Sequence, residues 1–171
     1  MFRVVSISPT DPAAAWSIFV ATSLRVGSPT PVDTKLALGD WLNDFMNLTK
    51  AQGSRVDFIA LHYYATEFDD VDAAVANFKV HIQRVRDVYR LSIWVAEFAT
   101  VSYHADPSQW DLPDEATQGR FLTAACQMLN HLPYVEKYAW FAVPQNETQP
   151  ATNLFDSQGN ITPLGNLCKA M

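Results

Sequence analysis

The sequence predicts an α/β protein built on a parallel β-sheet, and three observations carry this prediction. Amphipathic helices alternate with short strands, the strands are almost wholly apolar, and polar or aromatic residues gather where the strands end. The 171 residues contain no low-complexity tract and no linker, and 49% of them are apolar against 18% charged. We therefore expect a single globular domain over residues 1–171.

Two helix–strand units are expected in the first part of the chain. A helix should begin near Asp11, because Pro12 suits a first helical turn and apolar residues follow it. A short strand over residues 24–27 comes next. A second helix ends near Gly53 and leads into a strand over residues 56–64. The apolar face of this second helix consists of Leu38, Trp41, Leu42, Phe45 and Met46.

Two further units complete the pattern. A third helix repeats apolar side chains at steps of three and four from Val71 to Tyr89, and a strand over residues 93–98 follows it. A fourth helix precedes the last clear strand, residues 138–143. The apolar residues of the fourth helix are Leu122, Ala125, Leu129 and Leu132. We expect the four strands to be parallel neighbours in the order in which they occur along the chain.

Two architectures fit this alternation, an open doubly wound sheet and a (β/α)₈ (TIM) barrel. The glycine fingerprint of a dinucleotide-binding sheet is absent. A barrel needs about 250 residues, whereas this chain offers four helix–strand units, so we expect a partial barrel. Half a barrel leaves two sheet edges and an apolar inner face uncovered, which predicts self-association.

Composition and charge exclude several classes of function. The formal net charge is −6 and no Lys/Arg cluster occurs, which argues against binding to nucleic acid or to an acidic membrane surface. No apolar run approaches the roughly 20 residues that span a bilayer, and the first residues lack the apolar core of a signal peptide. We expect no metal and no cofactor, because no phosphate loop, zinc-binding helix or calcium loop appears. Cys126 and Cys168 have no metal-ligand spacing; free thiols are expected, and a single disulfide stays open.

Glu97 is the candidate nucleophile because it ends an otherwise apolar strand. Carboxylates are rarely buried without a partner, so this one should point to the mouth of the structure. Regular alternation would put Ile93, Val95 and Glu97 on one face of the strand. The alternative is a strand-end glutamate that turns into solvent.

Histidine and tyrosine side chains end the strand before Glu97. His62 and Tyr64 share one face of that strand and Tyr63 lies on the other. A phenol that donates to Glu97 would keep this carboxylate ionised and oriented, and we expect this role for Tyr64. The other reading of these residues is ordinary core packing.

Two aromatic residues share one face of the last strand. Tyr138 and Trp140 could bind the C–H faces of sugar rings or pack in a core. If the first interpretation holds, Trp140 converges with Glu97, His62 and Tyr64 at the carboxyl ends of the strands.

Several segments together resemble one enzyme family in its own order. These segments are Ser8-Pro9 with residues 13–16, residues 24–29, residues 56–64, residues 93–99, residues 138–141, residues 153–156 with Gly159, and residues 161–165. The chain is similar along nearly its whole length to the Asl1-like glycosyl hydrolase domain, glycoside hydrolase family 128. The resemblance implies the C-terminal half of its barrel, with strands five to eight and their helices.

The resemblance also implies a retaining endo-β-1,3-glucanase that binds β-glucan and acts outside the cell or in the cell wall. Glu97 aligns with the nucleophile, Tyr64 with the aromatic that orients it, and Trp140 with the sugar platform; His62, Tyr63 and Tyr138 are further candidates for substrate binding. The Asn-Glu-Pro segment that carries the family's acid/base is absent, so we expect this chain to be inactive by itself. The alternatives are a non-catalytic carbohydrate-binding remnant and another clan A glycosidase of the mannanase or cellulase type.

Overall fold

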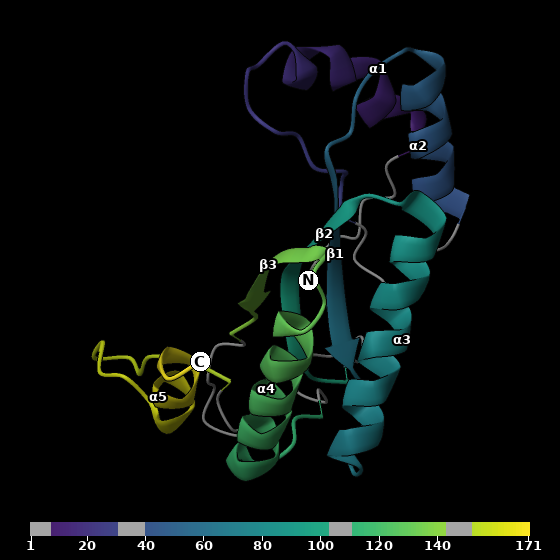
Figure 1. Cartoon of the computed structure of the whole chain (residues 1–171). Coiled ribbons are helices and arrows are strands. Elements are labelled where there is room, and N and C mark those ends of the chain that lie inside the picture. The colour runs from purple at the N-terminus through teal and green to yellow at the C-terminus, as the bar shows by residue number, and fades with distance from the viewer. Residues whose placement is uncertain (1–7, 31–39, 103–110, 143–151) are drawn as a thin grey trace.

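The computed structural model describes residues 8–30, 40–102, 111–142 and 152–171. Within these residues, five α-helices accompany a parallel sheet of three strands in the order β1-β2-β3 (Figure 1). The strands are β1 (Phe58–Ala65), β2 (Ser92–Thr100) and β3 (Val135–Trp140). The helices are α1 (Thr10–Val20), α2 (Asp40–Ala51), α3 (Val71–Tyr89), α4 (Glu115–Asn130) and α5 (Pro163–Lys169). The predicted α/β class with a parallel sheet is confirmed.

The expected strand over residues 24–27 is reduced to a single parallel bridge between Gly27 and Phe58. The amide of Asp57 donates to the Val26 carbonyl at 2.8 Å, and the amide of Ser28 donates to the Phe58 carbonyl at 2.9 Å. Glycine allows this approach, because a Cβ at Gly27 would lie 2.2 Å from the Phe58 ring. The segment therefore borders β1 in the expected parallel sense, although it forms no full strand.

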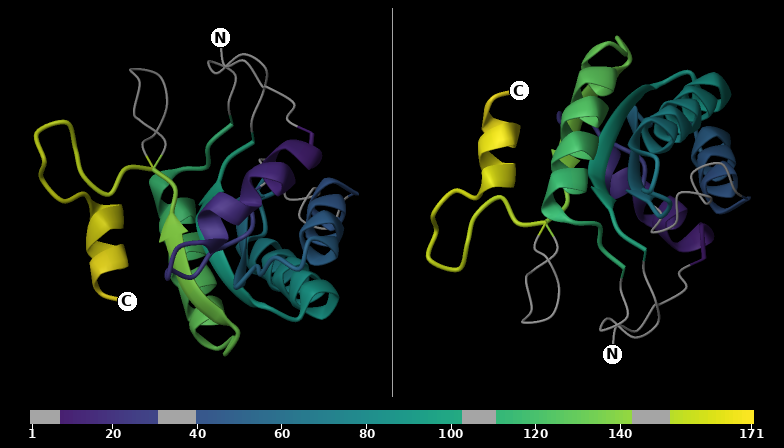
Figure 2. Two further views of the ribbon diagram at one scale, coloured as in Figure 1. Left: turned by 90° about the horizontal axis from the view of Figure 1, so that it is seen from above. Right: turned by 90° about the horizontal axis from the view of Figure 1, so that it is seen from below.

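The helices α3 and α4 pack side by side along one face of the sheet and build the main core with it (Figure 1). In Figure 2, α1, α2 and α3 lie to one side of α4, and α5 lies to its other side. Successive side chains of a strand point to opposite faces of the sheet. Ile59 and Leu61 of β1 point toward the helices and are fully buried. No helix of the described part of the chain covers the opposite face, which is called the helix-free face below.

Side-chain caps fix where the long helices begin. Asp70 accepts a hydrogen bond from the amide of Ala73 at 2.9 Å, and Asp114 accepts one from the amide of Thr117 at 2.7 Å. At its other end, α3 stops at Arg90, which adopts a left-handed conformation with φ of 58°. These caps define the first residues of α3 and α4, the helices that follow β1 and β2 along the chain.

The closing segment forms a turn and a short helix that the helix–strand pattern does not predict. Phe155 and Ile161 form an antiparallel bridge, and Thr162 caps α5 by accepting a hydrogen bond from the amide of Gly165 at 3.0 Å. Cys126 and Cys168 are free thiols, as expected, and form no disulfide with each other. None of the helices in the described part of the chain is both long and apolar enough to traverse a membrane.

Candidate active site

A β-bulge in β2 decides where Glu97 points. The register with β1 steps from Leu61 opposite Val95 to His62 opposite Glu97, so Ala96 is an extra residue. Val95 is fully buried toward the helices, and Phe98 takes the next buried position. The expectation that regular alternation puts Glu97 on the face of Val95 is therefore wrong, because the extra residue turns Glu97 to the helix-free face.

Two side chains of β1 meet the Glu97 carboxylate at the carboxyl end of the sheet. The Tyr64 hydroxyl donates a hydrogen bond to Oε2 of Glu97. Nδ1 of His62 lies 3.4 Å from the same oxygen. The His62 side chain is 17% exposed and the Glu97 side chain 32%, so a ligand can reach the carboxylate. The structure thus brings together three of the residues that the sequence singles out.

The electrostatic surroundings of Glu97 are those of a carboxylate without a permanent counter-ion. Burial lowers the pKa of His62, and the negative charge of Glu97 opposes this effect. The imidazole is therefore neutral at neutral pH. Within the described residues, this neutral ring is the only basic side chain within 4 Å of the Glu97 carboxylate, and no lysine or arginine nitrogen pairs with it.

Tyr63 lies on the other side of the sheet, away from Glu97. It is 9% exposed, and its ring stacks on Phe78 of α3 with 4.0 Å between the ring centroids. Burial raises the pKa of Tyr63 to about 12. The expectation that Tyr63 binds substrate beside Glu97 is corrected, because strand alternation commits its ring to the core.

Trp140 and Tyr138 share one face, as expected, but it is the face toward α4. They pair with Phe98 and Val95, the buried side chains of β2. The Trp140 indole donates to the Thr152 carbonyl at 2.9 Å, and its ring meets Phe98 edge-on at 5.3 Å. The expected sugar platform at Trp140 and the substrate contact at Tyr138 are therefore corrected to packing roles.

The hydroxyl of Tyr138 likewise turns toward α4 and donates to Oδ1 of Asn130 at 2.8 Å. The alternation of side chains along the strand correctly predicts that Tyr138 and Trp140 share a face. It does not determine whether that face is turned toward the helices or away from them. That choice depends on the bulge in β2 and on a second register shift between β2 and β3.

Phe141, the residue directly after β3, has its aromatic ring on the Glu97 side of the sheet. Its ring meets that of Tyr64 edge-on, with 5.7 Å between the centroids, and its amide donates to the Phe98 carbonyl at 2.9 Å. Phe141 is not among the site residues expected from the sequence. The available signal was its place one residue after Trp140, since neighbouring strand residues face opposite sides.

The amino end of the same helix-free face holds a second glutamate, Glu136. Arg25 donates to both of its carboxylate oxygens, at 2.8 and 3.0 Å, and the Trp94 indole donates at 2.8 Å. The hydrogen bond from Arg25 is the largest cause that lowers the pKa of Glu136 to about 2. Beneath this ion pair, Phe58 and Trp94 stack with 3.9 Å between their centroids. This end of the face is closed by ion pairing and aromatic packing.

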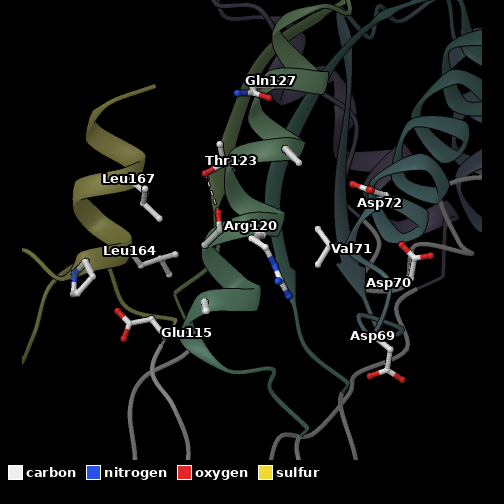
Figure 3. A pocket seen from close by; sticks show the side chains of 14 residues that line it. Asp69, Asp70, Val71, Asp72, Glu115, Arg120, Thr123, Gln127, Leu164 and Leu167 are labelled. Carbon is white, nitrogen blue, oxygen red and sulfur yellow. Dashed lines mark hydrogen bonds between the residues drawn. The ribbon is translucent and has the colours of Figure 1, made fainter.

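A groove of about 1060 Å³ lies elsewhere, between the start of α3, the outer side of α4 and α5 (Figure 3). Acidic side chains at the start of α3 and Leu164 and Leu167 of α5 line it. None of the site residues expected from the sequence borders it. Among the described residues, no three His, Cys, Asp or Glu side chains gather as metal ligands would.

Barrel enzymes place their catalytic residues at the carboxyl ends of parallel strands. The Glu97 carboxylate lies at such an end. The family model described as "Glycosyl hydrolase catalytic core" matches residues 3–167, so the chain belongs to this family of glycosyl hydrolases. Among curated protein sequences, none matches the chain.

Solved structures support the resemblance to glycoside hydrolase family 128. A subgroup I endo-β-1,3-glucanase from Amycolatopsis mediterranei, in complex with laminaritriose, is 32% identical with a TM-score of 0.83. The match covers 96% of this chain and 65% of that enzyme, so the chain spans less than two thirds of its length. A subgroup II endo-β-1,3-glucanase from Sorangium cellulosum is 25% identical with a TM-score of 0.69, covering 94% of this chain and 62% of that one. A subgroup V exo-β-1,3-glucanase from Cryptococcus neoformans, 22% identical with a TM-score of 0.71, shares the fold over 94% of this chain and 61% of its own.

Proposed function

We propose that this chain forms strands five to eight of a retaining β-1,3-glucan hydrolase barrel and carries its nucleophile, Glu97. One observation carries the proposal: the Glu97 carboxylate stands at the carboxyl end of the sheet, and the Tyr64 hydroxyl holds it there. A nucleophile must stay ionised and free to attack. A neutral phenol donor favours the charged form without tying it up in an ion pair.

The curvature of the sheet supports the barrel assignment. Arg25 lies in the segment that borders β1, and Glu136 lies on β3, so three strand spacings separate them. At about 4.8 Å per spacing, a flat sheet would hold these backbones about 14 Å apart. Their bidentate contact over the stacked Phe58 and Trp94 rings fits a sheet that curls toward its helix-free face, as barrel strands do.

Retaining hydrolysis requires a second carboxyl group about 5–5.5 Å from the nucleophile. Glu97 attacks the anomeric carbon while the second group protonates the departing glycosidic oxygen, and the same group then takes a proton from the water that releases the sugar. The Asn-Glu-Pro segment that would supply this acid/base is missing from the sequence. We therefore assign the acid/base to the part of the barrel that this chain does not span.

The substrate we assign to the completed site is a β-1,3-glucan, bound as a poly- or oligosaccharide. The Amycolatopsis neighbour binds laminaritriose, and both that enzyme and the Sorangium neighbour are β-1,3-glucanases, which favours this class over a mannanase or a cellulase. The reading as a non-catalytic carbohydrate-binding remnant depended on an aromatic platform at Trp140. That ring packs against Phe98 instead, so nothing specific favours the remnant.

Covalent trapping tests the nucleophile without needing the acid/base. A 2,4-dinitrophenyl 2-deoxy-2-fluoro-β-laminaribioside carries a leaving group that departs unprotonated, so the glycosyl–enzyme ester should accumulate. We expect mass spectrometry of a peptic digest to place the adduct on Glu97. The Glu97→Gln variant should take up none, while Glu67→Gln, a change at an exposed glutamate beyond β1, should react like the wild type. An adduct on another residue, or equal labelling of Glu97→Gln, contradicts the assignment.

We also propose that the protein acts outside the cell or in the cell wall, where β-glucans occur, and that the chain self-associates when produced alone. β3 is the last strand of the described sheet, and a free strand edge is a template for pairing. Sedimentation velocity should give a mass above that of one chain. A monomer at all concentrations contradicts the self-association, and retention inside the producing cell contradicts the location.

A further inference from the structure

Both polar neighbours of Glu97 converge on one of its two carboxylate oxygens. The Tyr64 hydroxyl donates to Oε2, and Nδ1 of His62 lies 3.4 Å from that same oxygen. A distance of 3.4 Å is longer than an ordinary N–H···O hydrogen bond, and contacts between catalytic groups in unliganded active sites often tighten when substrate binds. The second oxygen, Oε1, takes part in neither contact.

We propose that His62 is a positioning residue that anchors Oε2 of Glu97 together with Tyr64, and that Oε1 is the oxygen that attacks the sugar. This inference rests on the proposed function, since it names the reacting atom of the same nucleophile. It gives His62 a role through Glu97 rather than the direct substrate contact expected from the sequence.

The tautomer of His62 follows from this role. To donate to Oε2, the neutral ring must carry its proton on Nδ1, which leaves Nε2 as a hydrogen-bond acceptor. Burial lowers the pKa of His62 and thereby keeps the ring neutral at neutral pH. A neutral donor orients the carboxylate without neutralising it, whereas a permanent cation would reduce its nucleophilic character.

Few charged groups face His62 from the elements around it. Glu97 lies opposite on β2, and Tyr64 shares its face of β1, with 6.3 Å between the two ring centroids. On the other border of β1, residues 28–30 are Ser-Pro-Thr and contain no group that titrates near neutral pH. Among the described neighbours, the charge that acts on His62 is therefore that of Glu97.

The first test reads the contact directly and does not depend on activity. The imidazole resonances of the four histidines are followed by NMR against pH, and His62 is identified by the signal that its Asn variant lacks. Glu97→Gln removes the negative charge that raises the pKa of His62, so this pKa should fall by about one pH unit. The same pKa in Glu97→Gln and wild type would overturn the contact.

The second test separates the two nitrogens of the ring. Asn at position 62 places an amide donor where Nδ1 stands, whereas Gln places it where Nε2 stands. With the fluoro-laminaribioside described above, His62→Asn should trap the sugar within about threefold of the wild-type rate, and His62→Gln should be slower by about tenfold.

Each outcome bears on one of the two claims. Equal rates for His62→Asn and His62→Gln contradict the positioning role. If the wild-type chain traps no sugar on Glu97, the proposed function fails, while the NMR titration still decides whether His62 and Glu97 are in contact.

Discussion

Two glutamates stand at opposite ends of the same helix-free face, and their surroundings differ in kind. Glu136, at the amino end, is held by the Arg25 guanidinium and the Trp94 indole, which drive its pKa to about 2. Glu97, at the carboxyl end, is held by a phenol and faces a histidine whose pKa is lowered.

The difference is that between a carboxylate fixed in an ion pair, Glu136, and one bound by a neutral hydrogen-bond donor, Glu97. An arginine that binds both oxygens engages the whole carboxylate in an ion pair and ties together the two segments that carry the partners. Neutral donors on one oxygen keep a carboxylate charged and leave the other oxygen available. The same residue type therefore forms an ion pair at one end of the face and is our proposed nucleophile at the other.

The largest expected effect concerns catalysis in a completed barrel. Joined to the part of the Amycolatopsis enzyme that this chain does not match, the wild-type chain should hydrolyse laminarin, and Glu97→Gln should lower kcat by about 10⁴-fold or more. Glu136→Gln should retain most of the activity, because its carboxylate touches no reacting atom. A reducing-sugar assay on the folded variants measures the activity of each. Near-normal turnover by Glu97→Gln would contradict the proposal that Glu97 is the nucleophile.

The next effect concerns the two neighbouring aromatics at the end of β3. Trp140→Ala removes a ring packed on Phe98, so we expect the free energy of unfolding to fall by about 3 kcal/mol, the low end for such a truncation because the ring is only partly buried. Phe141→Ala loses an edge-on contact with Tyr64, worth about 0.5–1.5 kcal/mol, and should mainly weaken oligosaccharide binding by the completed barrel.

Urea denaturation and titration calorimetry with laminaritriose distinguish the two variants. The reverse pattern, with Trp140→Ala stable but unable to bind sugar and Phe141→Ala unchanged in binding, would return the platform to Trp140.

The smallest effect is the dependence of stability on pH that Glu136 confers. Its pKa falls from the ordinary 4.5 to about 2 on folding, so its contribution is complete above the unfolded pKa and is lost as pH falls from about 4.5 to about 2. The contribution is small, because the pair is largely exposed to solvent. The difference in Tm between wild type and Glu136→Gln should therefore shrink across this window. A difference that stays constant from pH 6 to pH 2 would show that Arg25 does not hold the carboxylate.

The sequence by itself determined the class of fold and the candidate nucleophile. The 3.6-residue repeat of α3 and the apolar runs of β1 and β2 are local signals, because each element must bury one face. Strand alternation also determined that His62 and Tyr64 share a face and that Tyr63 does not, because the period of two holds throughout β1.

Only the tertiary structure decided which side chains accompany Glu97. The bulge at Ala96 is a property of the pairing between β1 and β2, and no pattern within β2 announces the extra residue. That single residue reverses the side of Glu97 relative to Val95. A further shift at β3 turns Trp140 to the helices and leaves Phe141 beside Tyr64. The physical reason is the register of neighbouring strands: a slip of one residue exchanges the two faces of a sheet, and register is fixed between strands rather than within them.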